Sequence, residues 1–272
     1  MNSQVDIVVI GDSCDGRETV KKIASTRPSI KMAFISRKFK KATTHDYLNV
    51  EYIKEEVVFT DYRNRLFGVY LKNGDRIFCT HLIIASGLAY KPFMIGNKRV
   101  PNVFNNTDDI PKVARMQPAV VLGNDNTAAK LALAVAKKYK QVYLCTKSIT
   151  LENATVANKN KLAEASNIVL LPNTSIIRAS CQDGVLVAVE LDNYSTVTCS
   201  AIFVKTEAKP ETTFVSDRLF SKDDSGFIKV SESAQSLLIP KCYAIGTCAI
   251  KTTKKMKTAM IEEILASFNG GN

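Results

Sequence analysis

The sequence has no long apolar run and few of the residues that build metal sites or nucleophilic active sites. No stretch of the 272 residues approaches the length of a membrane-spanning helix, and the N-terminal residues lack the order of a signal peptide, so we expect a cytoplasmic protein. There are only two histidines, His45 and His81, and neither lies in a pattern typical of a metal site or a catalytic triad. Both are interpreted as surface or strand-flanking side chains.

Cysteine is present, but without any pairing pattern. The seven cysteines form no CxxC motif and show no spacing typical of a metal site. Several of them lie inside apolar runs that are typical of strands. Reduced thiols in the protein core are therefore the expected state.

Composition limits both the architecture and the partners. With 46% hydrophobic residues, the chain can bury one large core or two ordinary ones, and we expect two domains. The net charge of +11 is interpreted first as a solvated basic surface, with an acidic partner bound through that surface as the open alternative. Nucleic acid is disfavoured as the partner, because no basic cluster is interleaved with aromatic residues that could stack on bases.

Residues 118–147 have the pattern of a complete strand, turn, helix and strand. A short apolar run ends at Leu122, Gly123 opens a tight turn, and apolar residues then recur at helical spacing. In a nucleotide-binding protein such a turn points the unpaired N–H groups of the helix at a phosphate, and it needs glycine where backbone and ligand approach most closely. That position holds Asp125, so an anion stands where an anion would bind.

The chain begins with another strand-turn-helix pattern. An apolar strand is followed by GDSCDG at residues 11–16 and by a helix predicted over residues 17–25. Compared with the dinucleotide-binding pattern GxGxxG, this turn keeps Gly11 and Gly16 but has Ser13 in the middle. The serine side chain partly blocks the close approach of a pyrophosphate.

The next predicted strand ends at Ile35, where a dinucleotide-binding protein has a carboxylate for the adenosine ribose. This position holds Ser36, and Arg37 follows it. An arginine at this place can hold a 2′-phosphate, but cations after an edge strand are often only solvated.

In the other segments, the spacing of apolar residues predicts strands and two more helices. Residues 52–82 have the pattern of a β-meander and run into an apolar strand that ends at Gly87. Helices are predicted over residues 154–166 and 257–268. Further strands are predicted near residues 168–171, 175–179, 185–191, 196–204, 227–230 and 242–245.

Four segments in this order resemble the signatures of the pyridine nucleotide-disulfide oxidoreductases, and most closely the thioredoxin reductase branch. They are IIASGLAYKP at 83–92, GNDNTAAKLAL at 123–133, FVKTEAKPETT at 203–213 and KCYAIGTC at 241–248. The resemblance implies an α/β fold of two Rossmann-like three-layer domains, each with a β-meander, the second inserted into the first. It implies an FAD-type domain over 1–113 and 213–272 and an NAD(P)-type domain over 114–212.

The resemblance also implies where cofactors would contact the chain. The implied cofactors are FAD and NAD(P)H, bound weakly or no longer bound, because several contact positions depart from the family's pattern. The redox-active CxxC of the family would fall at residues 113–117, where the chain reads VARMQ, so a dithiol relay to thioredoxin is excluded for this chain alone. No catalytic residue and no metal ligand is predicted. The implied cofactor contacts are Gly11, Ser13, Gly16, Ser36, Ala85, Gly87, Gly123, Asp125, Ala128, Lys147, Gly246 and Thr247.

Two hypotheses from different classes follow. In the first, the protein passes electrons from a nicotinamide nucleotide through flavin to an acceptor other than thioredoxin. In the second, it is a catalytically inactive pseudoenzyme that acts as a binding or regulatory module, and a dinucleotide sensor without chemistry lies between the two. The retained glycines agree with a nucleotide site, but equally with tight turns and close helix-strand packing alone.

Two remaining expectations concern thiols and assembly. Cys14 and Cys248 would both lie near the flavin site; they are interpreted as bystanders, with a thiol pair as the open alternative. The sequence does not determine the oligomeric state, and a homodimer is an open alternative because dimers are common among proteins of this type.

Overall fold

The computed structural model describes residues 2–39, 47–107, 117–151 and 153–269. Their contacts divide into two compact units, the first formed by residues 1–89 with 208–272 and the second by residues 90–207. The division differs from the sequence-based boundaries at 113/114 and 212/213. Residues 90–107 pack in the second unit, where β10 (Val103–Phe104) pairs with β17 (Ala201–Val204).

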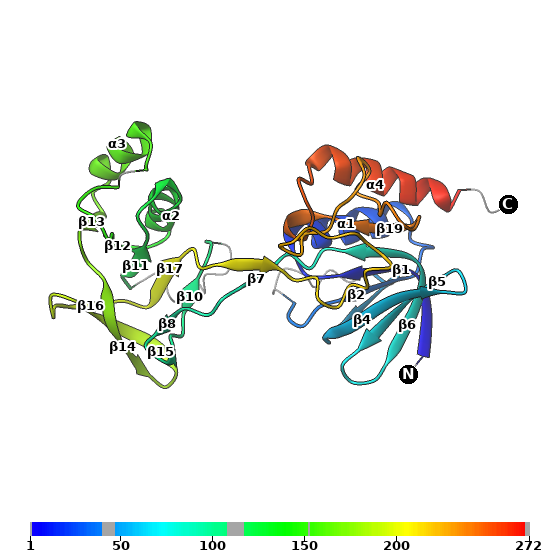
Figure 1. Ribbon diagram of the computed structural model, residues 1–272, viewed down its shortest axis with the longest axis horizontal. Coiled ribbons are helices and arrows are strands. Elements are labelled where there is room, and N and C mark those ends of the chain that lie inside the picture. The colour runs from blue at the N-terminus through cyan, green and yellow to red at the C-terminus, as the bar shows by residue number, and fades with distance from the viewer. Residues whose placement is uncertain (1, 40–46, 108–116, 152, 270–272) are drawn as a thin grey trace. The chain divides into compact units, whose positions relative to one another are not determined.

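The first unit is built on one seven-stranded sheet (Figure 1). Four parallel strands lie in the order β3-β2-β1-β6, so the chain crosses over between β1 and β6. Strand β6 has two neighbours on its other side, because its first half pairs antiparallel with β5 and its last residues pair parallel with β19. The strands are β1 (Asn2–Ile10), β2 (Met32–Ile35), β3 (Val50–Ile53), β4 (Val57–Arg63), β5 (Leu66–Leu71), β6 (Arg76–Ile84) and β19 (Cys242–Ala244).

Helices α1 (Cys14–Thr26) and α4 (Lys254–Ser267) cover one face of this sheet (Figure 1). They bury apolar side chains at helical spacing, such as Val20 and Ile23 of α1 and Ile264 of α4, against Ile7 and Val9 of β1. The meander β4-β5-β6 and the segment before β19 enclose a second core on the opposite face. No helix in the described ranges is long and apolar enough to cross a membrane.

The second unit repeats this architecture with a five-stranded parallel sheet in the order β10-β17-β11-β12-β13. Helix α2 packs on one face through Ala132 and Val135, and the antiparallel meander β14-β15-β16 packs on the other. A hairpin of β8 and β9 contacts β14. The elements are β8 (Met94–Ile95), β9 (Lys98–Arg99), β11 (Ala119–Leu122), α2 (Asn126–Ala136), β12 (Val142–Cys145), α3 (Val156–Glu164), β13 (Ile168–Leu171), β14 (Ile176–Gln182), β15 (Val185–Leu191) and β16 (Thr196–Thr198).

The predicted α/β class with a meander in each domain is confirmed, while two predicted strands were wrong in form. The single strand expected over 196–204 is two strands in two sheets, because the chain passes from β16 into β17 at Ser200. Residues 227–230 form no strand; isolated bridges instead pair Ile228 with Ala249 and Val230 with Ser236. An apolar run indicates that a segment is buried, but it does not indicate which sheet the segment joins.

His81 is a core residue, which corrects the expectation of a surface or flanking side chain. It lies on β6 with 2% exposure, and its ring packs against Phe268. Its Nδ1 lies 3.0 Å from Thr80 Oγ1 and its Nε2 lies 2.9 Å from Ser267 Oγ, so each ring nitrogen has a hydroxyl partner. Burial, together with the charge of Lys241, lowers the pKa of His81 to about 4. His45 lies outside the described residues.

Candidate nucleotide-binding sites

In the turn between β1 and α1, a side chain of the turn itself caps the N-terminus of the helix. Ser13 is the N-cap residue of α1, in an extended backbone conformation. Its Oγ accepts a hydrogen bond from the backbone N–H of Gly16 at 3.0 Å. This N–H is one of the free donors that a phosphate at a helix N-terminus would use. Ser13 therefore already engages one of the N–H groups at this helix N-terminus.

Gly11, Gly16 and Ala85 meet beside this turn, and the chain itself requires the two glycines. A Cβ on Gly11 would lie 2.4 Å from the carbonyl oxygen of Ala85, and one on Gly16 would lie 2.3 Å from the carbonyl oxygen of Gly11. Both distances are far inside van der Waals contact. Close packing of the turn on the end of β6 therefore explains both glycines without a ligand.

Charged side chains gather between the N-termini of α1 and α4. Lys257 Nζ lies 2.9 Å from Asp15 Oδ1 and also donates to the Glu18 carboxylate. This hydrogen bond and the charge of Lys257 lower the pKa of Glu18. A Cβ on Gly246 would lie 2.9 Å from Asp15 Oδ2, so glycine leaves room for the carboxylate. A cavity of about 230 Å³ adjoins these residues, none of which except Gly246 was predicted from the sequence.

Replacing Lys257 with methionine is expected to lower the free energy of unfolding by about 1 kcal/mol. Methionine keeps most of the side-chain volume but leaves Asp15 and Glu18 without their shared cation. The effect is modest because the Glu18 side chain is 59% exposed and therefore well solvated. Urea unfolding of the full chain measures it, with Lys255→Met, exposed on the same helix, as the control. Equal losses in the two variants would contradict a specific role for the ion pairs.

Ser36 and Arg37, which follow β2, form a hydrogen bond and ion pairs with other residues of the protein. Ser36 Oγ donates a hydrogen bond to the carbonyl oxygen of Lys38 at 3.0 Å. Arg37 pairs with Glu211, and its Nη1 lies 3.9 Å from the Glu56 carboxylate. The cation suggested for a 2′-phosphate thus already pairs with Glu211, whereas Glu56 pairs more closely with Lys72, at 2.9 Å.

At the ends of β6 and β19, the predicted contacts Gly87 and Thr247 lie next to each other. A Cβ on Gly87 would be 3.6 Å from Thr247 Oγ1, which is ordinary contact distance. The neighbouring Cys248 is buried, its Sγ lies 3.2 Å from the carbonyl oxygen of Ile245, and burial raises the pKa of its thiol. Cys14, by contrast, is exposed, and both cysteines are free thiols.

In the turn between β11 and α2, a side chain again caps the N-terminus of the following helix. Asp125 is the N-cap residue of α2, and its Oδ1 accepts a hydrogen bond from the backbone N–H of Ala128 at 2.9 Å. A Cβ on Gly123 would lie 2.6 Å from the Cβ of Ala128, so strand and helix approach too closely for a side chain there. Asp125 supplies the negative charge that a phosphate would otherwise bring to this helix N-terminus.

Two asparagines hold Asp125 in place from either side. Asn124 Oδ1 accepts hydrogen bonds from Ser148 Oγ at 2.8 Å and from Ser148 N at 3.2 Å. Asn126 Oδ1 accepts from Asn158 Nδ2 at 2.7 Å. The turn is therefore tied to the segments that follow β12, and its carboxylate is positioned by the fold.

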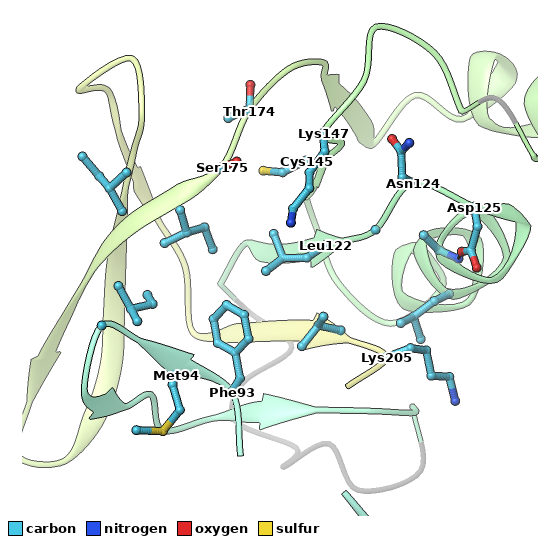
Figure 2. A pocket seen from close by; sticks show the side chains of 18 residues that line it. Phe93, Met94, Leu122, Asn124, Asp125, Cys145, Lys147, Thr174, Ser175 and Lys205 are labelled. Carbon is cyan, nitrogen blue, oxygen red and sulfur yellow. Dashed lines mark hydrogen bonds between the residues drawn. The ribbon is translucent and has the colours of Figure 1, made fainter. Parts of the chain in front are cut away.

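A cavity of about 830 Å³ lies at the carboxyl ends of β11, β12 and β17 (Figure 2). Its polar end includes Asn124, Asp125 and Lys147. Figure 2 shows the Lys147 side chain reaching toward Leu122, whereas the Lys205 side chain extends away from Leu122. The volume suits a small organic ligand. The apolar wall consists of Phe93, Met94, Ile95, Leu122, Ile176, Ile177 and Val204.

Sequence reasoning identified the polar end of this cavity but missed the apolar wall. Phe93 and Met94 belong to the segment before the β8–β9 hairpin turn, and Ile176 begins β14. These residues are far from the glycine turn in sequence and follow no motif. The contact between β8 and β14 brings them to the cavity, so no spacing in the sequence could have indicated it.

The described residues offer no metal site, and the cysteine that lines the cavity is buried. No group of three histidine, cysteine, aspartate or glutamate side chains in the described ranges could hold a metal ion. Cys145 lines the cavity, but burial raises its pKa to about 12, so it stays protonated at neutral pH.

At each turn a side chain already engages one N–H of the helix N-terminus, Ser13 that of Gly16 and Asp125 that of Ala128, and this donor set does not match that of a free pyrophosphate site. We therefore derive no reaction step through flavin or nicotinamide. Residues 113–116, where most of a CxxC motif would fall, lie outside the described residues, and their sequence contains no cysteine.

Two units built on parallel sheets, each with a glycine turn opening a helix, define a two-domain dinucleotide-binding fold. The family model of the pyridine nucleotide-disulphide oxidoreductases matches residues 3–262, and the chain belongs to this family. No curated protein matches the chain.

Solved structures of thioredoxin reductases share the fold over almost their whole length. The enzyme of T. acidophilum is 15% identical with a TM-score of 0.67, covering 98% of each chain. That of Lactococcus lactis is 16% identical with a TM-score of 0.66, covering 97% of this chain and 98% of the other. That of Streptococcus pyogenes is 17% identical with a TM-score of 0.63, covering 98% and 100%. The fold is therefore thioredoxin reductase-like.

Proposed function

We propose that the chain is a pseudoenzyme with a thioredoxin reductase-like body that acts as a binding module. The observation that carries the proposal is shared by both units: Ser13 and Asp125 each cap the helix whose N-terminus would receive a phosphate. The close contacts of Gly11, Gly16 and Gly123 with the chain itself support it, since these glycines need no cofactor to explain them. The absence of any CxxC in the sequence agrees with a lost dithiol relay. We further propose an acidic partner, which the net charge of +11 favours.

An absorbance spectrum and a stability titration test this function. The purified chain is expected to show no flavin band between about 350 and 500 nm. FAD or NADPH, each at about 1 mM, is expected to leave the melting temperature unchanged, because a ligand that does not bind the native state cannot stabilise it. A flavin band, or oxidation of NADPH that depends on added FAD, would contradict the proposal.

A flavin-dependent oxidoreductase with an acceptor other than thioredoxin is the second candidate. It is favoured by the cavity at the strand ends of the second unit, which contains the cation Lys147. This function predicts that NADPH reduces an artificial acceptor such as ferricyanide when FAD is present. The pseudoenzyme predicts no rate above that of free FAD.

A further inference from the structure

Helix α2 and the turn that follows it have a basic outer face. Lys130, Lys137 and Lys140 are exposed there. Residues 126–140 contain no aspartate or glutamate, so this face carries charge of one sign. Lys130 and Lys137 are separated by two helical turns, about 10 Å along the helix axis, and they lie on the same side of the helix.

Helix α3 packs against α2 and adds positive charge beside this face (Figure 1). It contributes the exposed Lys159 and Lys161 against one exposed carboxylate, Glu164. In the part of the second unit that the structure describes, ion pairs involve Lys91 and Arg178 and none of the lysines of α2 or α3. The ammonium groups of this surface are therefore available to an anionic partner.

The helical layer of the first unit differs, because its helices carry both signs of charge. Helix α1 contains Asp15 and Glu18, and helix α4 contains Glu262 and Glu263. Lys257 of α4 donates to both carboxylates of α1. The one-signed surface is thus a local feature of α2 and does not follow from the net charge alone. Its self-repulsion would be relieved by a partner of opposite charge.

An apolar side chain lies between the charges of α2. Leu133 is only partly buried. It is three residues after Lys130 and four before Lys137, which places it on the same side of the helix as both. A partner that brought only negative charge would leave this leucine uncovered.

Two further apolar side chains are exposed near the N-terminal ends of α2 and α3. Val156, the first residue of α3, is 72% exposed, and Ile149 in the preceding loop is 71% exposed. The loop is anchored by the buried Leu151. The start of α3 is tied to α2, because the backbone N–H of Thr155 donates to Asn126 Oδ1 at 3.1 Å. The fold therefore holds both side chains in solvent.

This combination favours a polypeptide over the other anionic partners. Tyr139, the one aromatic residue of 126–140, is 3% exposed, so bases would find no ring on which to stack. The main apolar side of α2, with Ala132 and Val135, is buried in the core of the unit, so the helix has no broad apolar face to insert into a lipid surface. An acidic polypeptide supplies carboxylates and apolar side chains together.

We propose that the outer face of α2, with the adjoining α3, docks an acidic segment of a partner protein. Carboxylates of the segment pair with Lys130 and Lys137, and its apolar side chains cover Leu133. The inference rests on the proposed function, because it locates the surface that binds the acidic partner of the module.

Fluorescence anisotropy of a short labelled peptide of glutamates interrupted by leucines tests this surface on the full chain. Lys130→Glu combined with Lys137→Glu is expected to weaken binding by at least about tenfold, because two attractions become repulsions. Lys21→Glu combined with Lys22→Glu is the matched control, since it makes the same change of charge at exposed positions of α1 and should keep the affinity within about twofold. A peptide with serine in place of leucine should bind about threefold more weakly.

Equal losses in the two double variants would overturn the inference, and so would a natural chain that does not bind the peptide. Tighter binding of an oligothymidylate or of phosphatidylserine vesicles through Lys130 and Lys137 would also overturn it, because the partner would then belong to another class. The spectrum and the NADPH assay decide the proposed function separately. A colourless, inactive chain with equal losses is still a pseudoenzyme and loses only this docking surface, whereas a flavin band with NADPH turnover contradicts the proposed function even where the peptide binds.

Discussion

Replacing Gly11 with alanine is expected to destabilise the first unit by about 3 kcal/mol or more, with no nucleotide present. The new Cβ would lie 2.4 Å from the Ala85 carbonyl oxygen and 2.5 Å from Ser86 Cα, both of which are backbone atoms that side-chain rotation cannot move. The φ of +109° at Gly11 adds strain for any L residue. Urea unfolding followed by circular dichroism measures the loss.

Gly74→Ala is the matched control for this variant. Gly74 also has a left-handed φ, +90°, but a Cβ there would meet nothing within 4 Å. It should cost about 1 kcal/mol, which is the backbone strain alone. Equal losses at Gly11 and Gly74 would mean that the space at Gly11 is free in the folded chain and available to a ligand, which would weaken the pseudoenzyme proposal.

Acidification is expected to remove about 3 kcal/mol of stability through His81 alone. The pKa of this side chain is lowered from 6.5 to about 4 in the folded protein, so the unfolded chain binds the proton more readily. The contribution is complete above pH 6.5 and is lost as the pH falls from 6.5 to about 4, below which both states are protonated.

The test compares urea unfolding at several pH values for the natural chain and His81→Gln. Glutamine cannot titrate, so the difference between the two slopes isolates His81 from the carboxylates and from His45. The natural chain should lose stability more steeply than the variant between pH 6.5 and about 4. Parallel curves would contradict the buried neutral imidazole.

Much of the fold followed from local pattern. The apolar runs that became β1 and β11 and the helical spacing of Val20 and Ile23 report burial directly, because periodicity depends only on which face of an element meets the core. The strand at 196–204 was one of two exceptions, since β16 and β17 are nearly continuous in sequence and separate only in space.

The candidate sites divide in the same way. The sequence by itself determined that serine and aspartate replace the middle glycines of two turns, and that the chain has no CxxC. Only the tertiary structure decided that Lys257 pairs with Asp15 across 242 positions and that β8 supplies a wall of the cavity. Such contacts depend on how separate elements pack, and spacing along the chain carries no record of that packing.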